Sequence, residues 1–390
     1  MKARGSALTT PGGIGWQGSR PLSMLGPSLP QATAQRLREA NFHTLRDVLV
    51  RSPQELVELL DALSPSEVAS LVSLVADGAC PAPRTASEVC EAEEQPGRRR
   101  PVPTGLAPLD ALLGGGVQPG RVTEVVGPAG AGKTQLCLGL CAHAVAAASV
   151  GGAGGGGVIY VDAEGKFSAG RLAEMIGALF PEAYGFGPPS GEAARRAARE
   201  EAVGKVYVVT PRSIAELLGA LEAAEVRAID ARACLVIVDS MACLARLEFP
   251  GGARDTLVRR NLMLGHTAAR LKVLAESLDL AVVVTNQIMG MPGTTTRDQG
   301  LGELDWKPAL GYQWAHAVNA RLLLDHNHAS GHGRGHGAGV GTLTVAKSSV
   351  SPRVRFRYSV EVRGVQLEEG SGVDADARAY EDWNRRTKKA

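Results

Sequence analysis

The segment GPAGAGKTQ at residues 127–135 constrains the fold of this chain more than any other stretch of its sequence. It fits the pattern Gly-x-x-x-x-Gly-Lys-Thr, in which main-chain amides turn inward around phosphate oxygens. The chain contains 48 glycines, so the string alone could be a glycine-rich turn that matches by chance. Its flanks decide the matter, because the apolar run VTEVVG precedes it and the helical pattern TQLCLGLCAHAVAAA follows it. A strand, a glycine-rich loop and a helix in this order predict a nucleotide site.

Each residue of the loop is expected to contact the nucleotide, and Lys133 is expected to reach its β- and γ-phosphates. Thr134 offers a hydroxyl to Mg²⁺, and Asp239, at the end of the apolar run CLVIVDS, is placed to hold the water shell of that ion. Asp239 could instead cap the helix that follows it. The predicted cofactors are therefore ATP and Mg²⁺, bound by Gly127, Pro128, Ala129, Gly130, Ala131, Gly132, Lys133, Thr134 and Gln135.

Hydrolysis needs a group that activates water, and the segment YVDAEGKF supplies two carboxylates. Strand alternation puts Asp162 and Glu164 on one face, with Glu164 farther toward the cleft, so Glu164 is the predicted general base. The segment VVVTNQ ends in Gln287, which we expect to sense the γ-phosphate, although an amide there could simply cap the strand end. The predicted catalytic residues are Glu164, Lys133 and Gln287.

The remaining pattern predicts an α/β fold. Apolar runs at residues 122–127, 158–164, 205–210, 234–240 and 281–287 alternate with helical patterns. They are apolar on both faces, as strands of a mostly parallel sheet covered by helices must be. Three later strand patterns, at residues 320–327, 341–349 and 353–364, follow without a helix between them and predict an antiparallel-leaning C-terminal β extension.

The N-terminal part predicts a small all-α domain. Thr44, Ser52 and Ser64 stand where helix N-caps are expected, and Pro53 and Pro65 follow two of them at the first helical position. Such a domain serves packing or docking, or contacts the DNA backbone.

The predicted organisation is a disordered tail (1–23), the helical domain (24–80), a solvated linker (81–104), the α/β domain (105–370) and a C-terminal tail (371–390).

Composition limits the partners and the compartment. A net charge of +2 does not by itself indicate nucleic-acid binding. We expect no membrane segment, because no apolar run reaches about 18 residues. The six cysteines form no Cys-x-x-Cys pair, which favours a reducing compartment, cytosol or nucleus, without structural zinc.

The order of these motifs resembles that of the RecA-like recombinases of eukaryotes over residues 24–367. The segments that carry the resemblance are GPAGAGKTQ, YVDAEGKFSAGRL, LVIVDS, LAVVVTNQI and ALGYQWAHAVNARLLL. The form of the loop, the glycine insert before VIYVD, the small residues in EGKFSAGRL and the segment AKSSVSP are similar to the B-type branch of the recombinase paralogues. The resemblance implies a RecA-like P-loop ATPase core.

It also implies roles for further residues. Arg171 matches a position that lies against the adenine, and Glu164 and Gln287 match the catalytic glutamate and the γ-phosphate sensor. Residues 247–261 and 289–310 match two loops that line a DNA channel, so the candidate DNA contacts are Arg254, Arg259, Arg260 and Arg297.

Members of the resembled family stack head to tail with ATP between neighbours. The paralogues resemble accessory subunits that assemble with one another, here with a C-type paralogue, and help the recombinase to load on DNA. The implied protein is a slow DNA-dependent ATPase of the nucleus that binds single-stranded and branched DNA during homologous-recombination repair of double-strand breaks.

Two departures favour an accessory role with specific partners over autonomous strand exchange, while the intact set of Lys133, Thr134, Asp239 and Glu164 disfavours a scaffold that does not hydrolyse ATP. The second channel loop is net acidic, with two basic and three acidic residues over 289–309, and the linker lacks the Phe-x-x-Ala motif of self-assembly. Lys347 matches a segment that caps the ATP of the neighbouring subunit, where a lysine could stabilise γ-phosphate charge in trans. An exposed lysine at a strand end is the alternative.

Overall fold

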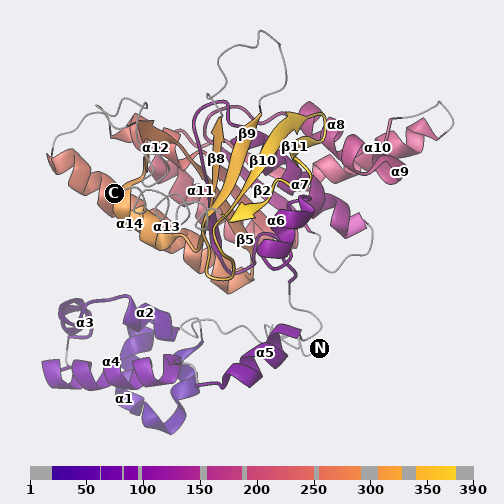
Figure 1. Cartoon of the computed structure of the whole chain (residues 1–390). Coiled ribbons are helices and arrows are strands. Elements are labelled where there is room, and N and C mark those ends of the chain that lie inside the picture. Colours follow the sequence, from indigo (N-terminus) through magenta and orange to yellow (C-terminus); the bar gives the residue numbers. More distant parts are fainter. Residues whose placement is uncertain are drawn as a thin grey trace. The chain divides into compact units, whose positions relative to one another are not determined.

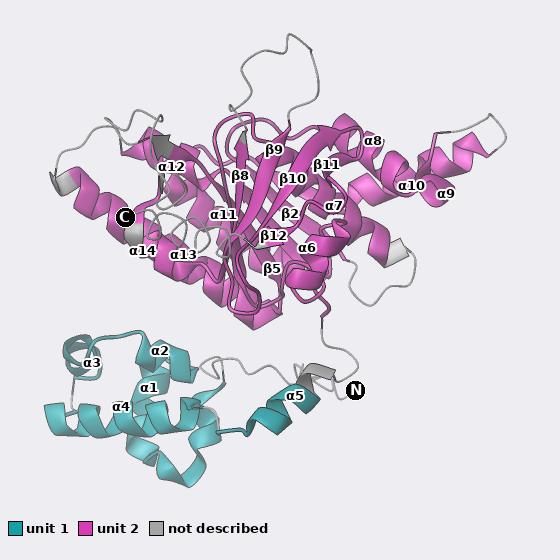
Figure 2. Ribbon diagram, in the orientation of Figure 1, with its two compact units in different colours: residues 1–98 teal, residues 99–390 magenta. Residues whose placement is uncertain are grey.

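The structure is a computed structural model. In it the chain divides into two compact units, residues 1–98 and 99–390 (Figure 2). The structure describes residues 20–61, 63–80, 83–94, 99–149, 156–186, 191–249, 254–290, 306–326 and 340–374. The predicted tails, 1–23 and 371–390, lie almost entirely outside these residues.

The N-terminal unit is helical, as predicted. Its elements are η2 (Leu22–Ser28), α1 (Gln31–Glu39), α2 (Leu45–Leu49), α3 (Pro53–Leu59), α4 (Pro65–Ala79) and α5 (Ala86–Glu94). The Thr44, Ser52 and Ser64 side chains each accept a hydrogen bond from the third helical amide. The acidic side chain at that third position accepts one from the main-chain amide of the capping residue, which completes three capping boxes. Leu37, Leu45 and other apolar side chains pack a separate core in this unit.

The segment predicted as a solvated linker, residues 81–104, contains more structure than expected. It holds helix α5, whose first amides are capped by Thr85 and Glu88. Its last residues belong to the second unit, because Val102 is 1% exposed and forms a β-bridge with Val117. Proline content and charge predicted solvation at 81–104 but could not indicate this local capping and bridging.

The second unit is built on a ten-stranded sheet (Figure 1). Its strands run in the spatial order β11-β10-β9-β8-β1-β5-β4-β2-β3, and β12 pairs with β10. Parallel pairing joins β8, β1, β5, β4, β2 and β3, whereas β9, β10, β11 and β12 add antiparallel pairs. The predicted mostly parallel core with a C-terminal β extension is therefore confirmed. The strands are β1 (Val122–Val126), β2 (Val158–Asp162), β3 (Val206–Val209), β4 (Leu235–Asp239), β5 (Ala281–Asn286), β8 (Ala320–His326), β9 (Gly341–Lys347), β10 (Val354–Glu361), β11 (Gly364–Leu367) and β12 (Val373–Asp374).

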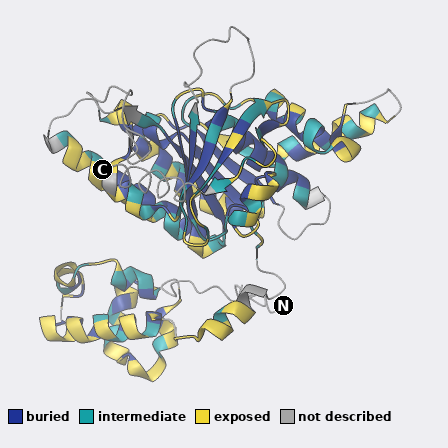
Figure 3. Ribbon diagram, viewed as in Figure 1, coloured by how far each residue is buried: buried dark blue, intermediate teal, exposed yellow. Residues whose placement is uncertain are grey.

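Helices cover both faces of this sheet, and strand alternation divides the core accordingly (Figure 3). Val158 and Tyr160 of β2 pack with α6 (Ala107–Leu112), α7 (Lys133–Ser149) and α8 (Ala169–Leu179). Ile159 and Val161 pack on the opposite side, with α11 (Ile214–Asp230), α12 (Met241–Glu248), α13 (Arg254–Leu278) and α14 (Gly311–Ala317). The unit also contains α9 (Pro181–Tyr184), α10 (Glu192–Gly204) and a small sheet of β6 (Ile288–Gly290) and β7 (Trp306–Pro308).

Strand β3 differs from the expectation that every core strand is buried on both faces. It pairs with β2 alone and ends the sheet, and its Val208 and Val209 are 41% and 37% exposed. The apolar run could not indicate that this strand lies at an edge. Among the described residues, the structure contains no helix long and apolar enough to cross a bilayer.

Candidate nucleotide site

The glycine-rich segment forms the loop between β1 and α7, at the carboxyl end of the parallel strands. A Cβ atom on Gly127 would lie 2.3 Å from the Leu324 carbonyl oxygen, so β8 leaves no room for a side chain there. Gly130 and Gly132 have φ angles of 81° and 88°, which residues with a side chain rarely adopt. These positions require glycine for a geometric reason, and the short loop that results leads directly into the N-terminus of α7.

Lys133 is buried, and its ammonium group lies inside the turn of this loop. Its Nζ atom donates to the carbonyls of Gly127 at 2.8 Å and Pro128 at 2.7 Å. Burial lowers the pKa of Lys133, while the carboxylates of Asp239 and Glu164 act in the opposite direction. An ammonium held by main-chain carbonyls at a helix N-terminus is placed to exchange them for phosphate oxygens, so the loop fits a triphosphate.

Thr134 and Asp239 meet beside the loop. The Thr134 hydroxyl donates to Asp239 Oδ2 at 2.7 Å, and that oxygen also accepts from the Tyr160 hydroxyl at 2.8 Å. Asp239 Oδ1 accepts from the Thr285 hydroxyl at 2.6 Å, so three hydroxyl donors fix this carboxylate. A hydroxyl and a carboxylate in contact next to a phosphate loop are the donor set that Mg²⁺ prefers.

The alternative role of Asp239 as a helix cap is wrong. The N-cap of α12 is Ser240, whose hydroxyl accepts from the Cys243 amide at 3.3 Å. The capping function thus falls to the residue after Asp239. The Asp239 carboxylate contacts the residue after Lys133 instead, through the Thr134 hydroxyl.

Glu164 lies just beyond the end of β2, within a hydrogen-bonded group that spans three elements. Its Oε1 atom accepts from the Ser240 hydroxyl and, at 3.2 Å, from the Gln287 amide. Its Oε2 atom forms an ion pair with Lys166 Nζ at 2.5 Å. Burial alone would raise the pKa of Glu164, but the hydrogen bonds from Lys166, Ser240 and Gln287 lower it below its ordinary value.

Strand alternation did not place Glu164 correctly, because the strand ends at Asp162. The Asp162 carboxylate folds the next residues into a turn by accepting from the amides of Glu164, Lys166 and Phe167 at 3.3, 3.0 and 2.9 Å. Asp162 therefore organises the loop, and the loop brings Glu164 to Ser240 and Gln287.

Gln287 follows β5 and joins this group to the centre of the sheet. Its side-chain amide donates to Glu164, while its main-chain amide donates to Asn286 Oδ1 at 2.8 Å. Asn286 in turn donates to Glu124 Oε1 at 2.7 Å. The two amides thus divide the roles that the sequence left open: Asn286 caps the strand end and Gln287 points into the site.

Arg171, at the start of α8, contacts the residue that ends the phosphate motif. Its Nε atom donates to Gln135 Oε1 at 3.0 Å, and its other nitrogens reach Glu174 at 2.6 Å and the Glu361 carbonyl at 2.7 Å. Arg171 and Gln135 are therefore neighbours at the side of the loop, although 36 positions separate them in the sequence.

Comparison with known proteins identifies the family of this chain. A family described as Rad51 matches residues 100–366, and an XRCC3/RpoA-like helix-hairpin-helix domain matches residues 26–79. The chain belongs to the Rad51 family. It therefore shares the RecA-like core of that family, and residues 26–79 of the N-terminal unit form a helix-hairpin-helix domain.

Individual relatives agree. DNA repair protein RAD51 homolog 2 of Homo sapiens is 32% identical over 328 residues, 79% of this chain and 81% of that protein. The protein of the same name in Arabidopsis thaliana is 32% identical over 300 residues, 73% of this chain and 77% of that protein. DNA repair and recombination protein RadA of Aeropyrum pernix is 28% identical over 305 residues, 76% of this chain and 84% of that protein.

Lys347 lies near the amino ends of β1 and β8, whereas the phosphate loop of this chain follows the carboxyl end of β1. Lys347 ends β9, which runs antiparallel to β8, and β8 runs parallel to β1. Its ammonium donates to the carbonyls of Ala315 at 3.0 Å and Val318 at 2.6 Å, at the C-terminus of α14. Burial lowers the pKa of Lys347, as do the charges of Arg321 and Lys272.

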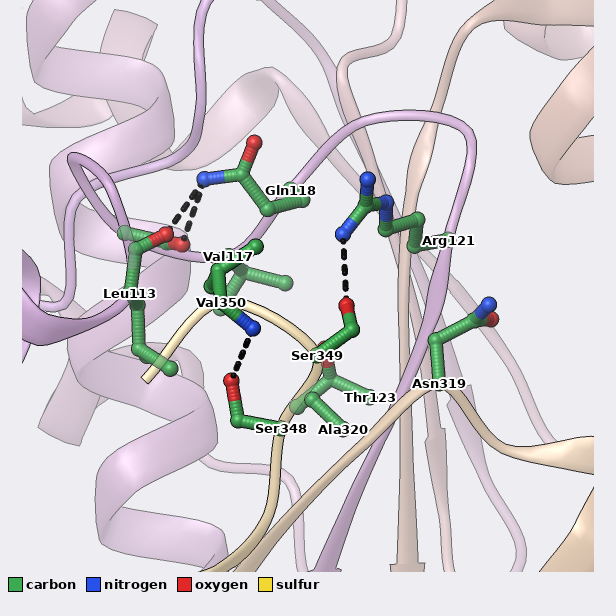
Figure 4. Close-up of a pocket in the computed structure, with 11 residues that line it drawn as sticks. Leu113, Val117, Gln118, Arg121, Thr123, Asn319, Ala320, Ser348, Ser349 and Val350 are labelled. Carbon is green, nitrogen blue, oxygen red and sulfur yellow. Dashed lines mark hydrogen bonds between the residues drawn. The ribbon is translucent and has the colours of Figure 1, made fainter. Parts of the chain in front are cut away.

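A pocket opens beside Lys347, at the same end of these strands (Figure 4). Arg121 points into it and donates to the Ser349 hydroxyl at 3.3 Å, while the Gln118 side chain donates to the carbonyls of Leu113 and Gly116. The pocket is lined at the amino end of β1, by Thr123, so it is not the site of this chain's own phosphate loop.

The residues expected to contact DNA stand on a helix more than on a loop. Helix α13 begins at Arg254, so most of the predicted channel loop 247–261 is helical, and only residues 249–253 separate α12 from α13. Arg259 is exposed, whereas Arg260 is half-buried and donates to the Ala309 carbonyl. Burial lowers the pKa of Arg260. The side chain of Arg254, and Arg297 with the rest of 291–305, lie outside the described residues.

Sequence reasoning missed several residues of the site. Ser240 and Lys166 contact Glu164 directly, and Tyr160 and Thr285 fix Asp239. Tyr160 and Thr285 lie inside apolar strands, where a hydroxyl group within an otherwise apolar run could have indicated a buried hydrogen bond. Lys166 lies two residues from Glu164, a spacing that in a strand would have put both side chains on one face.

Proposed function

We propose that this chain is an ATP-binding, DNA-dependent ATPase that works as an accessory subunit of a recombinase-paralogue complex. It acts in the nucleus, in the homologous-recombination repair of DNA double-strand breaks. The observation that carries the proposal is the convergence of two pairs at one end of the sheet, Thr134 with Asp239 and Glu164 with Gln287. Together with Lys133, they supply the groups that phosphoryl transfer to water requires.

Each residue has a role that follows from its contacts. The loop amides and Lys133 bind the triphosphate, and Lys133 gives up its carbonyl partners as it does so. Mg²⁺, when bound by Thr134 and through water by Asp239, supplies positive charge against the phosphates. Glu164 accepts the proton of the attacking water, and Gln287, which donates to that carboxylate, senses the γ-phosphate. Arg171, beside Gln135, lies against the adenine.

The accessory role in a paralogue complex is supported by the similarity to the B-type branch. Both relatives above that are 32% identical carry the name RAD51 homolog 2. The proposed neighbour is the C-type paralogue. The proposed nucleic-acid partners are single-stranded and branched DNA, contacted by Arg254, Arg259, Arg260 and Arg297.

Lys347 remains part of the proposal as a residue that reaches the ATP of the neighbouring subunit. Its place at the edge opposite the phosphate loop suits a head-to-tail stack, since that edge would face the next subunit's nucleotide. To act there, Lys347 must leave the carbonyls of Ala315 and Val318. Mixing Lys347→Ala with wild-type partner subunits tests this role, and unchanged ATP turnover in every mixture would remove it.

The main experiment measures ATP hydrolysis by the chain together with its partner subunit, with and without single-stranded DNA. The wild type is expected to hydrolyse ATP faster with DNA, Glu164→Gln to bind ATP without hydrolysing it, and Lys133→Ala to lose binding. Binding by the wild type without any hydrolysis would favour a scaffold that uses ATP only to lock its interface. Strand pairing by the isolated chain would favour an autonomous recombinase instead.

A further inference from the structure

The loop that carries Glu164 also carries a second charged side chain, Lys166, which pairs with it. Because the Asp162 carboxylate holds the amides of Glu164, Lys166 and Phe167, the turn has a fixed shape. Lys166 is held two residues after Glu164, on the same turn. Its ammonium is therefore held at the Glu164 carboxylate by the same local structure that positions that carboxylate.

Lys166 occupies the Glu164 oxygen that the rest of the site leaves available. Oε1 already accepts from Ser240 and Gln287, and Oε2 pairs with Lys166 Nζ at 2.5 Å. A carboxylate that is to take a proton from water needs an oxygen directed at that water. In this arrangement the ammonium stands at that oxygen and neutralises the charge that makes the carboxylate basic.

The two members of the pair differ in their surroundings. The Lys166 side chain is 60% exposed, whereas the Glu164 side chain is 13% exposed. Ion pairs between two exposed side chains contribute little, but here one partner is enclosed and is the proposed base. The lysine can withdraw into solvent by rotation of its own side chain, while Ser240 and Gln287 keep the carboxylate in place.

The charged and titratable groups around Glu164 come from several elements. They are Lys133 on α7, Asp239 at the end of β4, Cys243 on α12 and Lys166 on its own loop. Lys166 is near enough to Lys133 to lower the pKa of the latter, although burial is the larger cause. Two ammonium groups therefore lie near one another at this site, one held by the phosphate loop and one held by the base.

We propose that Lys166 is a positioning residue that restrains Glu164, so that ATP turnover stays slow until the ammonium leaves Oε2. This inference rests on the proposed ATPase function and adds a means of regulating it. A bound phosphate chain or a partner subunit that draws Lys166 away would free Oε2 and restore the basicity of Glu164. The chain would thus carry its own brake on hydrolysis, next to the phosphate loop.

The test compares Lys166→Met, which keeps the length of the side chain and removes its charge, with Lys166→Arg, which keeps the charge. Lys166→Met is expected to raise kcat roughly threefold to tenfold with an unchanged KM for ATP. The acid limb of its kcat–pH profile is expected to move to higher pH, because loss of the cation raises the pKa of Glu164. Lys166→Arg is expected to behave as the wild type. Lys205→Met, which removes the ion pair to Glu201 on α10, is the matched control and is expected to leave kcat unchanged.

A second measurement needs no nucleotide. The carboxyl group of Glu164 is titrated by carbon-13 NMR in the free protein and assigned with Glu164→Gln, and Lys166→Met is expected to raise its pKa. A wild type that hydrolyses ATP while Lys166→Met does so equally or more slowly would overturn the inference and leave the ATPase proposal standing. A raised KM would overturn it too, by assigning Lys166 to the phosphates. Failure of the wild type to bind or hydrolyse ATP would instead contradict the proposed function.

Discussion

The hydroxyl of Tyr358 in β10 donates a 2.6 Å hydrogen bond to the carbonyl of Ala131 in the phosphate loop. Tyr358 is 1% exposed, and burial raises its pKa to about 12, so it remains a donor at neutral pH. The side chain of Val360, on the same strand, lies 3.1 Å from where a Cβ atom on Gly132 would be. The C-terminal β extension therefore supports the loop from outside, over more than 200 positions of sequence.

Tyr358→Phe should loosen the phosphate loop without disturbing the strand. It removes one buried hydrogen bond and leaves the Ala131 carbonyl without its donor, which should lower the free energy of unfolding by about 1 kcal/mol. ATP affinity should fall as well, because the loop becomes less ordered. Urea unfolding and equilibrium ATP binding measure the two effects. Tyr207→Phe on the edge strand β3 is the control, and equal losses in both variants would contradict the role of the Tyr358 hydroxyl.

Two glycine-to-alanine changes should act in opposite directions. At Gly127 an added Cβ would meet the Leu324 carbonyl at 2.3 Å, so Gly127→Ala should displace the loop and abolish ATP binding. At Gly219, within α11, nothing lies within 4 Å of such an atom, so Gly219→Ala should raise the free energy of unfolding by about 1 kcal/mol. Thermal unfolding and ATP binding distinguish them. Normal nucleotide binding by Gly127→Ala would contradict this prediction, because it would mean that the backbone of β8 moves away from the added methyl group at little cost.

The sequence predicted those parts of the site that local pattern controls. The phosphate loop, the strand that ends in Asp239, and the capped starts at Ser52 and Ser64 each depend on a few adjacent residues, and the structure has them where expected. The contacts of Tyr358 and Arg171 with the loop depend on the order of strands in the sheet, which periodicity does not give.

Two further differences have the same origin. The exposure of β3 follows from its single pairing partner. The sequence cannot indicate this, because an apolar run has the same pattern in the middle of a sheet and at its edge. The helical start of α13 at Arg254 replaced an expected loop, because the family position indicated a function and not a local conformation.

Glu124 and Arg321 form a buried ion pair between β1 and β8. Glu124 is wholly buried, and its Oε2 atom accepts from Arg321 Nε at 2.6 Å while Trp314 and Asn286 donate to Oε1. Arg321→Met leaves a buried carboxylate without its cation and should lower the free energy of unfolding by about 3 kcal/mol. Glu124→Gln combined with Arg321→Met should recover part of that loss in urea unfolding. A double variant less stable than the sum of the single changes would contradict this account.

Acid should remove the stability that Glu164 contributes. Although burial raises its pKa, hydrogen bonds from Lys166 and Ser240 outweigh that effect, and the folded pKa lies below the ordinary value of 4.5. A carboxyl group with a depressed pKa stabilises the fold above its unfolded pKa, and this contribution disappears as pH falls through the folded pKa. The difference in unfolding free energy between the wild type and Glu164→Gln should therefore be constant near neutral pH and shrink below about pH 4.5. A difference that grows on acidification would mean that burial dominates.

Arg259 and Arg260 are adjacent on α13 but should contribute to DNA binding in different ways. Arg259 is exposed, so Arg259→Ala should weaken single-stranded DNA binding roughly threefold to tenfold and lower the salt dependence by about one charge, with stability unchanged. Arg260 is half-buried and holds the Ala309 carbonyl, so Arg260→Ala should lower stability as well as DNA affinity. Fluorescence anisotropy over a range of salt concentrations, with thermal unfolding, separates the two effects. Arg196→Ala on the exposed face of α10 is the control, since that side chain is 73% exposed and pairs with Glu200 away from the site. An Arg259→Ala variant with the affinity and salt slope of the wild type would remove this face of α13 from the DNA-binding surface.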